Sequence, residues 1–66
     1  MQFVALHNFL ETARLGSIRR AAEVLWVAPP AVSRQIVLLQ QNFAAPLFER
    51  RATGLRLTTA GEVFVR

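Results

Sequence analysis

The side chains in this sequence that are best suited to chemistry are its arginines. All eight basic residues are arginines, and lysine, aspartate, cysteine and tyrosine do not occur. A guanidinium group presents N–H donors in a planar fork that matches phosphate and the edge of guanine. Because the net charge is +4, the composition favours an anionic partner, such as nucleic acid, phosphate or an anionic membrane.

Three residues near the middle of the sequence have the spacing of a base-reading surface. Pro30, Ser33 and Arg34 open a helix that we expect over about residues 30–44, and positions three and four apart share one helix face. Arginine can bind guanine or phosphate, serine can bond to base edges or phosphate, and a helix N-terminus favours phosphate. We therefore expect these residues to contact double-stranded DNA; the alternative is an ordinary solvated face.

Five other arginines are candidates for contact with the DNA backbone. Arg19 and Arg20 open a short helix expected over residues 18–25. Arg50, Arg51 and Arg56 lie in a hairpin expected over about residues 48–57, and we place them on one face of it, against phosphates or in the minor groove. The alternative is that these charges only keep the domain soluble. Arg50 has the further alternative of pairing with Glu49 or with a helix end.

The same residue inventory argues against catalysis and metal binding. His7 is the single histidine, and no nucleophile, base or metal-ligand set can be assembled around it. We therefore predict a protein that is not an enzyme and needs no cofactor. The first 13 residues lack arginine and lysine, unlike a signal peptide. The apolar stretch over residues 24–32 is too short to cross a bilayer, so a cytoplasmic location is expected.

The elements that position these arginines are predicted from apolar periodicity and helix-ending residues. Gly16 is expected to end a first helix near Leu15, and Ser17 to cap a second. The apolar stripe of the first helix is Phe3, Leu6, Phe9, Leu10 and Ala13. The face of the second helix is Ile18, Ala21, Ala22 and Leu25, whose alanines allow close approach of another helix.

A break over residues 27–30 precedes the third helix. Pro29 is expected to be non-helical because Pro30 follows it, and Pro30 suits the first helical position. Trp26 is expected to cover the edge of the core. The buried stripe of the third helix is Val32, Ile36, Leu39 and Phe43.

Beyond Pro46 the pattern changes to that of strands. Leu55 and Leu57 alternate with Arg56 around a turn at Thr53-Gly54. A fourth helix then opens with a capping box of Thr59 and Glu62, or with Thr58 as the cap. The predicted fold is mainly α: a three-helix core, a small two-stranded β hairpin and the start of a fourth helix, which together make a winged helix-turn-helix.

Four segments in this order resemble the N-terminal domain of LysR-type transcriptional regulators. They are GSIRRAAEVL (residues 16–25), PPAVSRQI (residues 29–36), PLFER (residues 46–50) and RLTTAGE (residues 56–62). The resemblance extends from Phe9 to Arg66 and implies a bacterial transcription factor. Its full-length homodimer would bind an interrupted palindrome in double-stranded DNA through two winged heads. It also implies a small-molecule effector that binds a larger C-terminal domain, absent from these 66 residues.

The sequence departs from that family at the start of the third helix. Ala28 and Pro29 stand where the family usually has a capping serine and a base-reading glutamine, and neither can offer a side-chain hydrogen bond. Gln40 stands where the family usually has an acidic residue, and Val37 and Leu38 at positions that are often polar. The alternatives are a protein-interaction or degenerate head without specific readout, and a basic amphipathic element on a membrane surface.

The domain division expected from these patterns has two parts. Residues 1–57 form the winged helix-turn-helix, and residues 58–66 form the start of a linker or dimerisation helix. The resemblance implies that the linker helix makes the dimer, and only the start of that helix lies within these 66 residues, so we expect a monomer or weak dimer for this length of chain.

Overall fold

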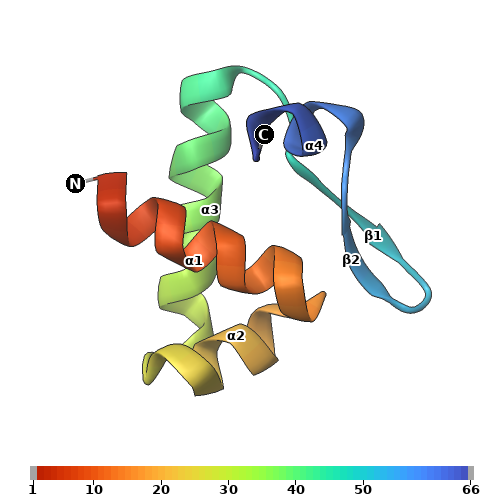
Figure 1. The fold of residues 1–66 in the computed structure, drawn as a ribbon. Coiled ribbons are helices and arrows are strands. Elements are labelled where there is room, and N and C mark those ends of the chain that lie inside the picture. The colour runs from red at the N-terminus through yellow and green to blue at the C-terminus, as the bar shows by residue number, and fades with distance from the viewer. Residues whose placement is uncertain (1, 66) are drawn as a thin grey trace.

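The computed structural model describes the backbone of residues 2–65 and the side chains of residues 4–65. The elements, in order, are α1 (Gln2–Leu15), α2 (Ile18–Leu25), α3 (Pro29–Phe43), β1 (Phe48–Arg51), β2 (Gly54–Leu57) and α4 (Thr59–Phe64). Figure 1 shows α1 crossing the middle of α3, with α2 below both and the hairpin beside them. The expected mainly α fold with one two-stranded hairpin is confirmed.

Local signals set the junction between α1 and α2. Gly16 has a φ of +68°, a left-handed conformation that glycine adopts without a Cβ penalty. Ser17 then caps α2, because its hydroxyl accepts a 3.1 Å hydrogen bond from the Arg20 N–H. Both expectations for this junction are confirmed.

The prediction that Pro29 precedes α3 is wrong. Pro29 is the first residue of α3, Pro30 is the second, and Ala28 is the extended residue before them. Both prolines fit here because the first N–H groups of a helix have no intrahelical acceptor to lose. The steric preference against a helical residue before proline is outweighed at this position.

The core lies where α1, α3 and the hairpin meet. One buried cluster contains Phe9, Leu39 and Leu47, and a second contains Ala22, Val32 and Ile36. Phe48 packs against both clusters, and its ring centroid lies 4.9 Å from that of Phe9. The expected burial of Val32, Ile36 and Leu39 on α3 is confirmed.

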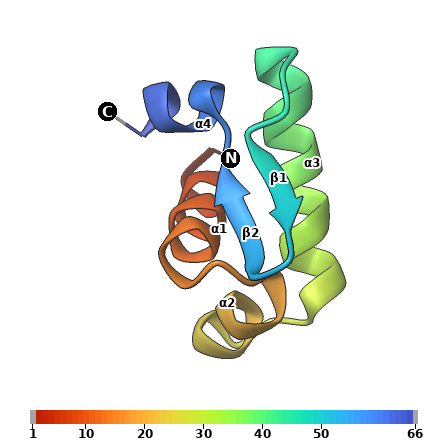
Figure 2. The same cartoon turned by 90° about the vertical axis from the view of Figure 1, so that its right-hand side faces the viewer.

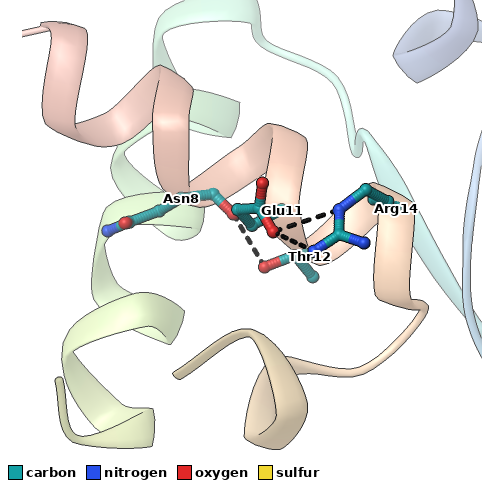
Figure 3. Close-up of polar contacts among 4 residues, drawn as sticks. All are labelled: Asn8, Glu11, Thr12 and Arg14. Carbon is teal, nitrogen blue, oxygen red and sulfur yellow. Dashed lines mark hydrogen bonds and ion pairs between the residues drawn. The ribbon is translucent and has the colours of Figure 1, made fainter. Parts of the chain in front are cut away.

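The buried face of α1 differs from the predicted one. Phe9 and Thr12 are fully buried, whereas Leu6 and Leu10 are 38% and 42% exposed. Thr12 can be buried because its hydroxyl donates a 2.8 Å hydrogen bond to the Asn8 carbonyl (Figure 3), which removes the penalty for a buried polar group. The prediction that Leu6 and Leu10 belong to the core is therefore wrong.

Phe43, predicted in the core, and Trp26, predicted to cover its edge, are both exposed. Phe43 is 48% exposed at the last residue of α3, where its ring forms a T-shaped pair with that of Phe64, with centroids 4.5 Å apart. Trp26 is 92% exposed. It ends α2 in a left-handed conformation with a φ of +62°, which leaves the indole outside the packing of α2 against α3. The side chain of Phe3, also predicted in the core, lies outside the described residues.

The hairpin is held at both of its ends. At the base, the Gln40 side-chain oxygen accepts hydrogen bonds from the N–H groups of Leu47 (2.8 Å) and Phe48 (3.3 Å). Near the tip, the Leu55 N–H donates a 3.0 Å hydrogen bond to the Gly16 carbonyl. The strands pair antiparallel around a two-residue turn, with Arg51 opposite Gly54, so the hairpin has a fixed position beside the helices.

Thr58 resolves the two sequence alternatives for the cap of α4. Its hydroxyl accepts a 3.0 Å hydrogen bond from the Gly61 N–H and donates one of 2.7 Å to the Pro46 carbonyl. Thr58 is thus the cap, and the capping box predicted at Thr59 does not form. The same side chain fixes the end of β2 to the segment that enters β1.

Candidate nucleic-acid interface

The axes of α2 and α3 differ in direction by 110° across a three-residue break. Ala21 and Ala22 are fully buried in α2, and their small side chains allow α3 to approach closely. Helix pairs with this angle and a short turn form the helix-turn-helix, in which the second helix enters the major groove of DNA. The geometry presents the start of α3 at the end of the molecule shown lowest in Figure 1.

The outer face of α3 contains the three residues predicted to contact DNA. Pro30 and Arg34 are exposed, and Ser33 is half-buried beside them. Ser33 and Arg34 follow Pro30 by three and four residues, which places all three on one face of α3. Arg34 forms no ion pair with any residue that the structure describes, so its guanidinium donors remain available to a ligand.

The N-terminus of α3 is a poor phosphate site, contrary to the expectation from sequence. Its first two residues, Pro29 and Pro30, have no N–H. The Ala31 N–H, which comes next, donates a 2.9 Å hydrogen bond to the Ala28 carbonyl, and Ala28 contributes no side-chain cap. Phosphate binding at a helix N-terminus depends on free N–H groups, so side chains must supply the donors here.

A basic hollow of about 470 Å³ lies where the start of α2 meets the hairpin tip. Its lining includes Arg19, Arg20 and Arg50, together with Ser17 and Thr53. Figure 2 shows the hairpin tip reaching the beginning of α2. Arg19 forms an exposed 3.5 Å ion pair with Glu23, which contributes little to stability and can be exchanged for another anion. Three arginines from two separate elements thus line one hollow.

The prediction that the hairpin arginines share one face is wrong. Arg50 lies opposite Leu55 and Glu49 lies opposite Arg56 in the ladder. Because successive residues of a strand point to opposite faces, Arg51 and Arg56 occupy one face and Arg50 the other. Arg50 lines the hollow at α2. The alternation of side chains along a strand is enough to separate Arg50 from Arg51.

One hairpin arginine is engaged within the strand. The Arg51 guanidinium donates two hydrogen bonds to Glu49, of 2.9 and 2.6 Å. The alternative left open from the sequence, a pair between Glu49 and Arg50, is therefore wrong, since Arg51 is the partner. Arg50 and Arg56 form no ion pair within the described part of the chain.

A second engaged arginine lies on α1. The Arg14 guanidinium approaches the Glu11 carboxylate to 2.7 Å (Figure 3). This hydrogen bond lowers the pKa of Glu11 and raises the pKa of Arg14, so both groups stay charged near neutral pH. Arg14 was not among the predicted contact residues. Because the Glu11 carboxylate balances its charge, Arg14 is a suitable control.

Sequence reasoning did not anticipate the hollow that joins Arg50 to Arg19 and Arg20. Each arginine was predicted separately from its own element, because periodicity describes one helix or strand at a time. The joining contact is the Leu55 N–H to Gly16 carbonyl bond, between residues 39 apart in the sequence. The glycines at positions 16 and 54 were the available signal, since glycine often marks a close approach of two backbone segments.

Two helices crossing at 110°, an exposed arginine at the start of the second and a basic hairpin beside them define a winged helix-turn-helix domain. Comparison with known proteins gives the family. Residues 3–62 match the family described as bacterial regulatory helix-turn-helix protein, lysR family. The chain belongs to this family, as the four sequence segments predicted.

Curated relatives and solved structures agree with this assignment. The chain is 54% identical over 54 residues to the HTH-type transcriptional regulator GalR of Pseudomonas putida. It is 42% identical over 66 residues to the HTH-type transcriptional regulator PcaQ of Agrobacterium fabrum. The alignments cover 82% and 100% of this chain but only 14% and 21% of those relatives. The chain thus spans a small part of their length.

The structural matches include free and DNA-bound domains. A LysR-family transcriptional regulator from Eggerthella lenta has a TM-score of 0.90 at 37% identity, over 98% of this chain and 93% of that one. The CbnR DBD–DNA complex has a TM-score of 0.91 at 35% identity, over 98% and 75%. The BenM DBD/catB site 1 DNA complex has a TM-score of 0.90 at 31% identity, over 97% and 72%.

Within residues 2–65, no single helix is long and apolar enough to cross a membrane. Only α2 and α3 taken together reach the required length and composition, and they do so as a pair bent by 110°.

Proposed function

We propose that this domain binds double-stranded DNA sequence-specifically, as the DNA-binding head of a bacterial LysR-type transcription regulator. The observation that carries the proposal is the exposed, unpaired Arg34 beside Ser33 on the outer face of α3. In this account α3 lies in the major groove, where Arg34 binds guanine or an adjacent phosphate and Ser33 bonds to a base edge or phosphate. Pro30 contributes an apolar contact at the leading edge.

The other arginines predicted to contact DNA hold its backbone. Arg19, Arg20 and Arg50 line one hollow, where they act as a phosphate-binding group. Arg56 and Arg51 lie on the opposite face of the hairpin and contact the backbone or minor groove. Arg51 contributes less, because Glu49 already occupies its guanidinium. Phosphate contacts set position, whereas the contacts of α3 with base edges set specificity.

The rest of the regulator follows from the family. The CbnR and BenM structures are complexes with DNA, and the relatives are transcriptional regulators several times longer than this chain. We propose residues 1–57 as the DNA-binding unit and residues 58–66 as the start of a linker helix. The full-length protein would be a cytoplasmic homodimer without enzymatic activity. It would bind an interrupted palindrome and a small-molecule effector.

Selection of duplexes from a random DNA pool tests the proposal. The wild-type domain should enrich a common half-site. Arg34→Ala should lose about 1–3 kcal/mol of binding free energy for the enriched duplex and relax the preference at one base position. The matched control is Arg14→Ala, which removes an arginine paired with Glu11 on α1 and should leave the half-site unchanged. Specific readout would be contradicted if no sequence is enriched, or if wild type and Arg34→Ala bind every duplex with equal affinity. Binding to anionic vesicles without binding to DNA would favour the membrane alternative.

A further inference from the structure

The outer face of α3 contains an apolar residue with no evident role in folding. Val37 follows Pro30, Ser33 and Arg34 by seven, four and three residues, the spacing of one helix face. Its side chain is 46% exposed, and it belongs to neither buried cluster of the core. A β-branched residue also loses side-chain freedom in a helix. Val37 therefore contributes little to the stability of the fold.

The position of Val37 places it on the hairpin side of this face. Gln40, three residues later and on an adjoining row of the helix, accepts hydrogen bonds from the first residues of the hairpin segment. Val37 thus lies between the exposed Arg34 and the edge of α3 that meets the hairpin. With a rise of about 1.5 Å per residue, it stands about 4.5 Å further along the helix axis than Arg34. That distance is comparable to the spacing of neighbouring base pairs.

Leu38 provides a comparison at almost the same exposure. It is 47% exposed, but one residue step turns it about 100° around the helix. It lines a hollow with Val4 and Ala5 of α1, on the side away from the hairpin. The two neighbouring apolar residues therefore have different surroundings. Val37 is three residues from Arg34 and four from Ser33, so it adjoins both, whereas Leu38 is four residues from Arg34 but five from Ser33 and adjoins Arg34 alone.

The major groove offers one apolar group to such a side chain. Of the four base edges, only thymine presents a methyl group there; the others present hydrogen-bond donors and acceptors. The start of α3 contains Pro29 and Pro30, which lack N–H groups. The face of α3 that would meet the bases therefore offers the Arg34 guanidinium, the Ser33 hydroxyl and the apolar side chains of Pro30 and Val37. This composition favours thymine near the base read by Arg34.

We infer that Val37 contacts the C5-methyl group of a thymine and is a specificity-determining residue of this domain. The inference rests on the proposed function, since it requires α3 to lie in the major groove. It adds a base preference that neither charge nor hydrogen bonding supplies. The thymine lies one or two base pairs from the position read by Arg34, on the side toward the hairpin.

The test replaces single thymines by uracil in a duplex recovered by selection with the wild-type domain. Uracil keeps every hydrogen-bonding group of thymine and lacks only the methyl group. At one thymine of the half-site the replacement should weaken wild-type binding roughly fourfold, the affinity equivalent of about one buried methyl group. Val37→Ala should bind the thymine duplex more weakly by a similar factor and show no further loss with uracil.

Leu38→Ala is the matched control and should keep the full wild-type response to uracil. Helicity and thermal unfolding by circular dichroism establish that both variants fold. A duplex that is bound specifically but shows no uracil penalty at any thymine would overturn the role of Val37 and leave the proposed function standing. The same holds if Val37→Ala retains the wild-type penalty. Failure to enrich any duplex would overturn both.

Discussion

The Gly54 backbone lies against the Gly16 carbonyl so closely that a Cβ on Gly54 would stand 2.6 Å from that oxygen. Gly54 also has a φ of +129°, which side-chain-bearing residues rarely adopt. The next residue, Leu55, donates a hydrogen bond to the same carbonyl. This contact fixes the hairpin to the junction between α1 and α2, and so places Arg50 beside Arg19 and Arg20.

Gly54→Ala should therefore lower the free energy of unfolding by about 2 kcal/mol, because both the backbone conformation and the close contact become strained. Urea unfolding followed by circular dichroism measures the change. The adjacent substitution Thr53→Ala, at an exposed turn position, is the control and should be nearly neutral. Equal stability of the two variants would show that the close contact is not a constraint.

Trp26→Gly should raise the free energy of unfolding by about 1 kcal/mol, since glycine relieves the left-handed strain at φ +62°. Little packing is lost, because the indole is 92% exposed. Trp26→Ala removes the same indole but keeps the Cβ that causes the strain, so its stability should remain near that of wild type. Thermal unfolding compares the two; destabilisation by both would mean that the indole does pack.

Gln40→Leu should cost about 2 kcal/mol, because the N–H groups of Leu47 and Phe48 would lose their shared acceptor in a partly buried place. Gln40→Glu keeps an acceptor oxygen at the same position and should retain most of the stability at neutral pH. Chemical unfolding of the three proteins measures the difference. A leucine variant as stable as wild type would show that these two bonds are dispensable.

Glu49→Gln should strengthen DNA binding and make it more dependent on salt, because it frees the Arg51 guanidinium and removes a negative charge from the hairpin. The slope of log K against log salt should steepen by roughly one. Glu11→Gln changes the net charge equally but acts on α1, so it should leave the slope nearly unchanged. A steeper slope in both variants would assign the effect to overall charge.

The elements of this fold could be predicted because their signals are local. Gly16 ends α1 and Ser17 begins α2 through their own conformational preferences, and the alternation around Arg56 indicates a strand. The buried face of α1 was misplaced because hydropathy favours Leu10 over Thr12. The hydroxyl of Thr12 bonds to a carbonyl of its own helix, and hydropathy does not include that bond.

The candidate site was predictable residue by residue but not as an assembly. Ser33 and Arg34 follow Pro30 by three and four residues, so their place on the same face of α3 follows from spacing alone. The hollow that contains Arg19 and Arg50 depends on the position of the hairpin, which is set by a contact between segments distant in the sequence. Trp26 was predicted to cover the edge of the core, but its backbone conformation at the end of α2 leaves it in solvent.

The proposed function requires the outer face of α3 to contact DNA. An NMR titration of the labelled domain with the selected duplex at low salt measures that contact. We expect the largest amide shifts in residues 31–37, followed by the start of α2 and the hairpin tip, and little change along the exposed face of α1. A duplex that binds while the amide signals of residues 31–37 stay unmoved would show that this face does not contact DNA.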